Sequence, residues 1–202
     1  MKRLLMTGVI TASACLSLPA FAEAMVGLPA PAFSGTDTNG KTHQLSDYKG
    51  RYLVLEWVNP GCPFVRKHYS GNMQATQNEA KAKGAVWLAV NSTAESQSDY
   101  HKPADLAKWM QSKNAAVNAT LMDTSGEIGK AFGAKTTPHM YIIDPKGTLV
   151  YAGAIDSKPT ARVDDIKDAT NYVKQALNES QSGKPVSVAT TNAYGCTVKY
   201  AN

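Results

Sequence analysis

The residue with the clearest chemical potential in this sequence is Cys62, within the segment Asn59-Pro60-Gly61-Cys62-Pro63. Residues 52–58, which come just before it, are nearly all apolar or aromatic, as in a central strand buried on both faces. Pro63 has a fixed φ and no backbone N–H, and both properties suit the first position of a helix. We therefore expect Cys62 at a strand-to-helix junction. There, helix N–H groups and the charges of Arg66 and Lys67 favour a nucleophilic thiolate.

A second cysteine, Cys196, lies near the C-terminus in the segment Tyr194-Gly195-Cys196-Thr197. The third cysteine of the chain, Cys15, falls in an N-terminal segment that we expect to be removed, so two cysteines remain. Two cysteines in an oxidising compartment can form a purely structural disulfide. Alternatively, in a redox cycle, one cysteine can attack a substrate and the other can resolve the resulting adduct. The Cys and His spacing shows no metal-binding pattern, so we expect no metal and no cofactor.

Residues 1–22 have the features of a cleavable secretory signal. Lys2 and Arg3 precede an uncharged, largely apolar run over residues 4–18, and Ala20-Phe21-Ala22 places small residues where signal peptidase requires them. A run of about 15 residues is shorter than the roughly 20 that a membrane-spanning helix needs. We expect cleavage after Ala22, a periplasmic or secreted protein, and no stable membrane insertion afterwards.

The composition of the remaining chain predicts one domain with little net charge. Removing 22 of the 202 residues leaves 180, and removing two of the 21 basic residues leaves 19 against 16 acidic ones, a formal charge of +3. The basic residues are scattered, without the stripe that nucleic acid binding requires, so we expect no nucleic acid partner. We expect a domain over residues 23–182 and an extended tail over residues 183–202 that carries Cys196 and packs back on the domain.

The order of the expected elements predicts an α/β sandwich with a mixed central sheet, because strands and helices interleave along the domain. Asn39-Gly40 is typical of a hairpin turn, and Pro145-Lys146-Gly147 is expected to turn a second hairpin. The further strands are expected over residues 85–90, 119–122, 140–143 and 149–152. The helices are expected over residues 63–83, 104–112, 125–132 and 163–177.

Several segments resemble the thioredoxin superfamily. Residues 53–58 before Cys62, and Thr137-Pro138 before the strand that starts at Met140, are similar to the pattern of that superfamily. More closely, four segments resemble the peroxiredoxin-like, redoxin-domain (AhpC/TSA-like) branch in the same order: 47–50, 59–69, 153–156 and 195–199. The resemblance implies a thioredoxin-like three-layer α/β/α sandwich. It also implies a cis bond between Thr137 and Pro138 that forms one wall of a substrate site beside Cys62.

The resemblance also implies site residues: Cys62 and Cys196 as catalytic residues, and Asn59, Pro63, Thr137 and Pro138 as substrate-binding residues. The chain departs from two better-understood patterns. Val65 stands where a thioredoxin has its second cysteine, so a local dithiol cycle is impossible. Asn59 stands where peroxiredoxins have Thr or Ser, and Leu55 stands where they have Pro, which weakens the case for peroxide reduction.

Three functions fit these residues. The first is an exported thiol-dependent oxidoreductase acting on protein or small-molecule thiols and disulfides, in which Cys62 attacks, Cys196 resolves and an unknown reductant protein supplies electrons. The second is a peroxidase variant, in which Cys62 becomes a sulfenic acid that condenses with Cys196. The third is a non-catalytic binding module, for example for copper held by Cys62 with His139 or Met140, with the disulfide only structural. His68 lies almost two helical turns past Cys62 and is expected to be a surface or packing residue rather than its base.

Overall fold

A mixed seven-stranded sheet forms the centre of the protein within residues 23–201, the part that this computed structural model describes. The predicted signal over residues 1–22 lies outside the described residues. The strand order is β2-β1-β5-β4-β3-β7-β8, with β3 parallel to β4 and antiparallel to β7. The strands are β1 Ser34–Asp37, β2 Thr42–Gln44, β3 Leu53–Trp57, β4 Val86–Asn91, β5 Ala119–Met122, β7 His139–Ile143 and β8 Leu149–Gly153.

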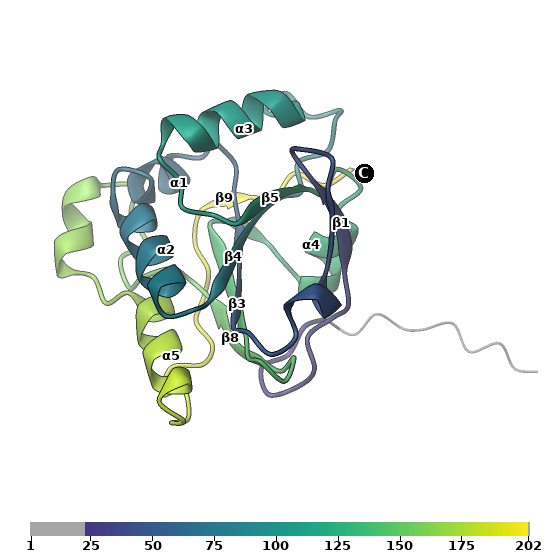
Figure 1. The fold of residues 1–202 in the computed structure, drawn as a ribbon. Helices are drawn as coiled ribbons and strands as arrows, with labels where there is room; N and C mark the ends of the chain where they lie inside the picture. The colour runs from purple at the N-terminus through teal and green to yellow at the C-terminus, as the bar shows by residue number, and fades with distance from the viewer. Residues whose placement is uncertain (1–22, 202) are drawn as a thin grey trace, which may run out of the picture.

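Helices cover both faces of this sheet. Helices α2 and α5 pack on one face, and α4 and the 3₁₀ segment η1 pack on the other (Figure 1). The helices are α1 Pro63–His68, α2 Asn72–Ala82, α3 Pro103–Ser112, α4 Glu127–Phe132 and α5 Tyr172–Gln181, with 3₁₀ segments η1 Leu45–Tyr48 and η2 Val163–Asp168. The arrangement confirms the predicted thioredoxin-like three-layer α/β/α sandwich.

The central strand β3 lies between two hydrophobic cores, as its apolar sequence predicts. Leu53, Leu55 and Trp57 pack in the core beneath α4, whereas Val54 and the following Val58 pack in the core beneath α2 and α5. All five residues of β3 are buried. Because successive side chains of a strand point to opposite faces, a strand covered on both sides needs apolar residues at nearly every position.

The helix predicted over residues 63–83 is in fact two helices, and that prediction is wrong in its continuity. Gly71 has φ of 134°, which is incompatible with a helix, and it separates α1 from α2. Ser70 donates its hydroxyl to the carbonyl of Lys67 and so satisfies a backbone oxygen at the end of α1. The helical conformation is therefore interrupted at Gly71, nine residues after Cys62.

The prediction of a helix over residues 163–177 is wrong in its bounds, because α5 covers only residues 172–177 of that range and continues to Gln181. Residues Val163–Asp168 form η2, which has no buried residue and projects from the body of the protein (Figure 1). The α-helix starts later because Asn171 caps it, accepting a hydrogen bond from the Lys174 N–H at 3.0 Å. Its buried face consists of Val173, Ala176 and Leu177.

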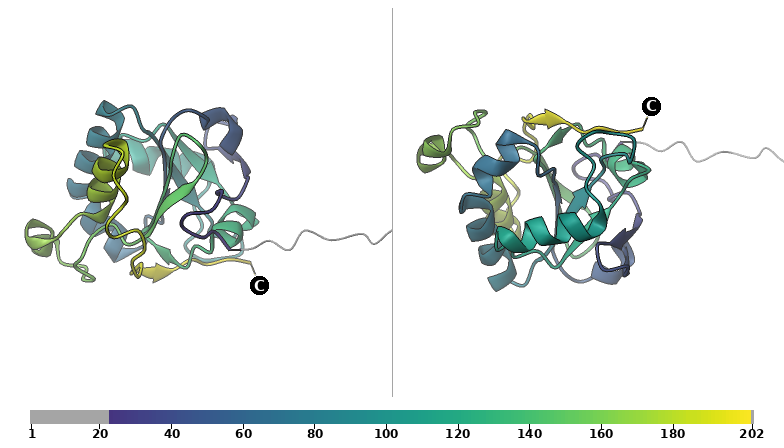
Figure 2. Two further views of the ribbon diagram at one scale, coloured as in Figure 1. Left: turned by 90° about the horizontal axis from the view of Figure 1, so that it is seen from below. Right: turned by 90° about the horizontal axis from the view of Figure 1, so that it is seen from above.

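The C-terminal tail, residues 183–201, packs on the domain and confirms that prediction. It first runs along the free edge of β8, where the Ala152 N–H donates to the Ala189 carbonyl at 3.1 Å. It then crosses the end of the sheet near α1, where the short strand β9, Cys196–Thr197, pairs with β6, Thr136–Thr137 (Figures 1 and 2). The tail thus brings the second cysteine to the carboxyl end of β3.

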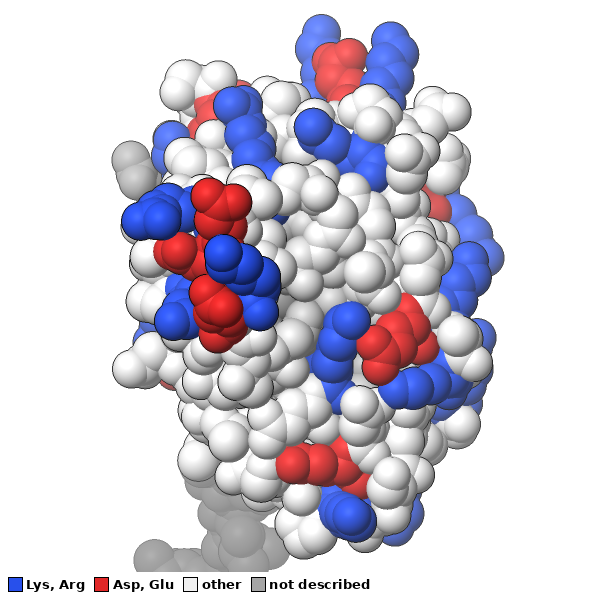
Figure 3. Space-filling model, turned by 90° about the vertical axis from the view of Figure 1, so that its left-hand side faces the viewer, with Lys and Arg blue, Asp and Glu red and all other residues white. Residues whose placement is uncertain are grey.

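The outer face that carries α2 and α5 has basic and acidic side chains interspersed, without a stripe of one sign (Figure 3). Within the described part of the chain, no helix is both long enough and apolar enough to cross a bilayer.

Candidate active site

Cys62 lies at the N-terminus of α1, directly after the loop that leaves β3. Its backbone N–H donates to the Asn59 carbonyl at 3.1 Å, and its own carbonyl accepts from the Arg66 N–H at 3.0 Å, the first bond of the helix. Pro63 occupies a first-turn position of α1, as predicted. Cys62 is only 2% exposed, and its thiol donates a hydrogen bond to the Thr137 carbonyl at 3.0 Å.

The side chain of Asn59 holds the loop that carries Cys62. Its Oδ1 accepts from the Gly61 N–H at 2.7 Å, and its Nδ2 donates to Thr93 Oγ1 at 3.0 Å and to Asp99 Oδ2 at 3.1 Å. Arg66 bends back and donates its Nε–H to the Pro60 carbonyl at 2.8 Å. These bonds fix the backbone around Cys62 before any substrate binds. Asn59 therefore has a clear structural role, and its role in substrate binding stays a prediction.

The Thr137–Pro138 peptide is cis, which confirms that prediction. Thr137 is 4% exposed and forms strand β6 with Thr136, and in β9 Cys196 is its direct antiparallel partner. Gly195, just before that cysteine, approaches so closely that a Cβ there would stand 2.0 Å from the Thr137 carbonyl oxygen. The two cysteines thus meet around one residue: Cys62 bonds to the Thr137 carbonyl and Cys196 pairs beside it.

Both cysteines are free thiols in this structure. Burial first, and then the neighbouring Cys62 thiol, raise the pKa of Cys196 to about 12. Cys196 is therefore protonated at neutral pH in the reduced protein.

Glu56 is a buried acid within the otherwise apolar strand β3, and it was not among the site residues predicted from the sequence. Burial raises the pKa of Glu56 to about 7, while hydrogen bonds from Trp87, Tyr69 and Gln77 oppose that rise. Trp87 Nε1 donates to Oε2 at 2.8 Å and Gln77 Nε2 donates at 3.0 Å, whereas Oε1 has no partner. A single acid in a strand covered on both faces was the signal that could have identified it.

Of the two histidines considered from the sequence, His68 is buried and His139 is half-buried. His68 is fully buried, and burial lowers its pKa to about 4. Burial likewise lowers the pKa of His139 to about 4, and its Nδ1 lies 3.2 Å from the Tyr141 hydroxyl. Met140 is fully buried in the same core as Cys62. Among residues 23–201, no group of three or more His, Cys, Asp or Glu side chains is arranged to hold a metal ion.

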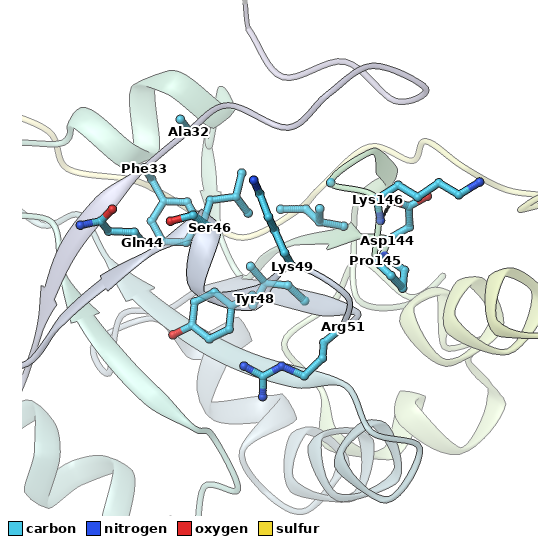
Figure 4. Close-up of a pocket in the computed structure, with 14 residues that line it drawn as sticks. Ala32, Phe33, Gln44, Ser46, Tyr48, Lys49, Arg51, Asp144, Pro145 and Lys146 are labelled. Carbon is cyan, nitrogen blue, oxygen red and sulfur yellow. Dashed lines mark hydrogen bonds between the residues drawn. The ribbon is translucent and has the colours of Figure 1, made fainter.

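The pocket shown in Figure 4 lies away from these thiols. It has a volume of about 530 Å³ and lies beside Leu53, at the end of β3 opposite to the one that leads to Cys62. Lys49, Arg51 and Lys146 surround it. No side chain of the loop, β6 or β9 takes part in it.

The fold and the thiol site define the class of the protein: it is a redoxin-type member of the thioredoxin superfamily. Residues 26–152, more than half of the chain, match the AhpC/TSA family. The chain belongs to the AhpC/TSA family.

Three proteins illustrate these relations. The chain is 30% identical over 125 residues to thiol-disulfide oxidoreductase ResA of Bacillus subtilis (strain 168), a match that covers 61% of this chain and 64% of that relative. An uncharacterised conserved protein from Geobacillus kaustophilus superimposes with a TM-score of 0.74 at 26% identity, over 92% of this chain and 98% of that one. The thioredoxin domain of a thiol-disulfide oxidoreductase from Bacteroides vulgatus superimposes with a TM-score of 0.52 at 21% identity, over 72% and 98%, and shows the fold alone.

Proposed function

We propose that this protein is an exported thiol-disulfide oxidoreductase in which Cys62 is the nucleophile and Cys196 is the resolving cysteine. The observation that carries the proposal is the meeting of both thiols at Thr137, whose carbonyl accepts from Cys62 and whose strand pairs with Cys196. The family and the relative named as a thiol-disulfide oxidoreductase support the same chemistry. Export rests on the signal pattern of residues 1–22.

The proposed cycle has two exchange steps. The Cys62 thiolate attacks one sulfur of a substrate disulfide, forming a mixed disulfide and releasing the other substrate sulfur as a thiolate with the bonding electron pair. Cys196 then loses its proton to solvent and attacks Cys62. The second substrate thiolate leaves, and the Cys62–Cys196 disulfide remains. A dithiol reductant protein reopens that disulfide by the same two exchanges, so electrons pass from the reductant to the substrate.

Single cysteine substitutions test this cycle on the mature protein with a disulfide-bonded peptide as substrate. Cys62→Ser should lower turnover to the uncatalysed rate. Cys196→Ser should instead accumulate a mixed disulfide between the peptide and Cys62, which mass spectrometry identifies. If Cys196→Ser forms no adduct at Cys62 and loses only stability, the pair is a structural disulfide and the proposed function is wrong.

The same variants separate disulfide from peroxide substrates. In peroxide reduction the Cys62 thiolate would attack an O–O bond and become a sulfenic acid, with hydroxide or alkoxide as the leaving group. The sulfenic acid would then condense with the Cys196 thiol with loss of water. Asn59 argues against this reaction, because its Nδ2 is already committed to Thr93 and Asp99 instead of facing a peroxide. Cys196→Ser treated with hydrogen peroxide should therefore form sulfenic acid at Cys62 more slowly than it forms the peptide adduct at equal concentrations.

A further inference from the structure

A buried cluster of charged and polar side chains lies between α1, the segment after β8 and the tail. Lys67 and His68 follow Cys62 in α1, Asp156 follows β8, and Tyr194 comes two residues before Cys196. The side chains of Lys67 and His68 are 0% exposed and that of Asp156 is 1% exposed. The three elements that surround the thiols are thus joined through one group of contacts.

The hydrogen bonds of this cluster converge on the Tyr194 hydroxyl. That hydroxyl donates to Asp156 Oδ1, and it lies 3.1 Å from His68 Nε2. Asn72 Nδ2 lies 2.8 Å from His68 Nδ1 and can donate to it, which leaves Nε2–H to donate to the Tyr194 oxygen. Burial and the Asp156 carboxylate raise the pKa of Tyr194 far above its ordinary value, so the hydroxyl keeps its proton.

Lys67 and Asp156 form a buried ion pair, and the side chain of Tyr194 packs against it. Lys67 Nζ lies 3.7 Å from Asp156 Oδ2 and donates to the Lys158 carbonyl at 2.8 Å. The Lys158 N–H donates in turn to Asp156 Oδ1 at 2.9 Å. The Tyr194 ring packs edge-on against Phe64, with ring centroids 5.8 Å apart, and Lys67 Nζ lies 5.5 Å from its centre. Buried ion pairs stabilise a fold little more than apolar residues of the same size would, so packing alone does not explain this cluster.

The position of Tyr194 in the tail gives the cluster a consequence for the thiols. Only Gly195 separates it from Cys196, and Gly195 is pressed against the Thr137 carbonyl. On the far side of Cys196, Lys199 Nζ pairs with Asp99 Oδ2 at 3.2 Å, and the Tyr200 hydroxyl donates to the Ala134 carbonyl at 2.7 Å. The tail is therefore held on both sides of Cys196, and the Tyr194 hydroxyl makes the nearest side-chain hydrogen bonds on the N-terminal side.

We propose that Tyr194 is a positioning residue that holds Cys196 in place to attack the Cys62 adduct, an inference that rests on the proposed function. A tethered but loose cysteine would reach Cys62 at an effective concentration in the millimolar range, whereas an oriented one reacts much faster. In the step that Tyr194 assists, a bond forms between the two cysteine sulfurs and the bond from Cys62 to the substrate sulfur breaks. The substrate sulfur takes the electron pair, and the proton of Cys196 goes to solvent.

The test uses one equivalent of the aromatic disulfide 5,5′-dithiobis(2-nitrobenzoate) with reduced mature protein in a stopped-flow instrument. The first thionitrobenzoate is released when Cys62 attacks, and the second when Cys196 resolves the adduct. Tyr194→Phe keeps the ring and removes the hydroxyl, so the second phase should slow about tenfold, as expected for a lost hydrogen bond to a charged group. The first phase should stay within about twofold of wild type or become faster.

Tyr200→Phe is the matched control, because it removes a hydroxyl that also fastens the tail but bonds to a neutral carbonyl beyond Cys196. Its second phase should slow less than about twofold. If Tyr194→Phe slows the second phase no more than Tyr200→Phe does, the positioning role is wrong while the proposed function stands. A wild-type protein that never releases the second thionitrobenzoate would instead overturn the resolving role of Cys196 itself. If Tyr194→Phe does not fold, Asp156→Asn is measured in its place against the same two outcomes, because it weakens the acceptor of the same hydrogen bond.

Discussion

At the level of single residues, the site combines a thiol held by backbone contacts with a second thiol held by a strand. Cys62 is fixed by the Asn59 carbonyl and by the helix that starts after it, so its position follows from the local sequence. Cys196 depends on contacts with residues far away in the chain, chiefly Thr137 and the partners of Tyr194. This difference explains why the sequence predicted Cys62 from its local surroundings, whereas it offered Cys196 only from the cysteine count, the apolar tail and family resemblance.

Glu56 leads to a prediction about pH. Its pKa is raised from 4.5 to about 7 in the folded protein, so the folded state binds a proton that the unfolded state has lost. The stability from this group is complete below pH 4.5 and is lost as the pH rises through 7, a loss of roughly 3 kcal/mol. Glu56→Gln keeps an oxygen acceptor for Trp87 and Gln77 and removes the titration. It should therefore be more stable than wild type at pH 8.

Urea unfolding of both proteins at pH 5 and pH 8 measures this effect. The difference in the free energy of unfolding between Glu56→Gln and wild type should grow in favour of the variant by about 2 to 3 kcal/mol from pH 5 to pH 8. Glu79→Gln is the control, because Glu79 is a surface acid paired with Lys83 and Lys174. A difference between Glu56→Gln and wild type that does not change with pH would show that Glu56 is ionised throughout.

At the level of elements, the sequence predicted the sheet better than the helices. The expected strand over residues 119–122 matches β5, those over residues 140–143 and 149–152 are one residue shorter at one end than β7 and β8, and that over residues 85–90 is shifted by one residue from β4. Long apolar runs between turn residues specify buried strands directly. The helices predicted over residues 63–83 and 163–177 have wrong bounds, and in each a single residue decides the outcome. These residues are Gly71, with its positive φ, and Asn171, with its capping side chain. Neither residue interrupts the apolar pattern enough to show the break.

The buried polar cluster illustrates a different limit of prediction. Its contacts join residues 91 to 127 positions apart, between α1 and Lys158 or Tyr194. The resemblance singled out segments 59–69 and 153–156, and the structure shows that Lys67 and Asp156 from these two segments form an ion pair. No periodicity within either segment indicates that pairing, so sequence reasoning had no physical basis for it.

The strand β9 leads to a prediction about Gly195. A Cβ at this position would stand 2.0 Å from the Thr137 oxygen and 2.8 Å from its carbonyl carbon, and both are backbone atoms that cannot move aside. Gly195→Ala should therefore break the pairing of β9 with β6 and expose Cys62. Alkylation of Cys62 by iodoacetamide should become about tenfold faster or more, because the thiol would no longer need an opening of the tail.

Gly183→Ala is the matched control for that experiment. Gly183 also has a positive φ, 70°, but nothing lies within 4 Å of a Cβ placed there. This variant should cost about 1 kcal/mol of backbone strain and leave the alkylation rate of Cys62 unchanged. Equal alkylation rates in the two variants would mean that β9 does not cover Cys62 in solution.

At the level of the whole molecule, three buried titratable groups act on stability in opposite directions. The folded protein keeps His68 and His139 neutral, since burial lowers the pKa of each from 6.5 to about 4. The unfolded chain binds protons at both histidines below pH 6.5, so stability from these groups is present above that pH and lost as the pH falls toward 4. Glu56 acts in the opposite direction: between pH 4.5 and 7 it releases about one proton on unfolding, which offsets the proton taken up by one of the two histidines.

The balance of these groups predicts the acid stability of the protein. Between pH 6.5 and 4.5, the unfolded state should bind about one proton more than the folded state. The free energy of unfolding should therefore fall by about 1.4 kcal/mol for each unit by which the pH is lowered. His139→Gln removes one buried imidazole and should make this slope nearly flat, whereas Glu56→Gln should about double it. His101→Gln, in the loop before α3, is the matched histidine substitution outside the sheet and its cores. Urea titrations at four pH values between 4.5 and 7.5 measure all four slopes, and the explanation fails if His139→Gln and His101→Gln give the same slope.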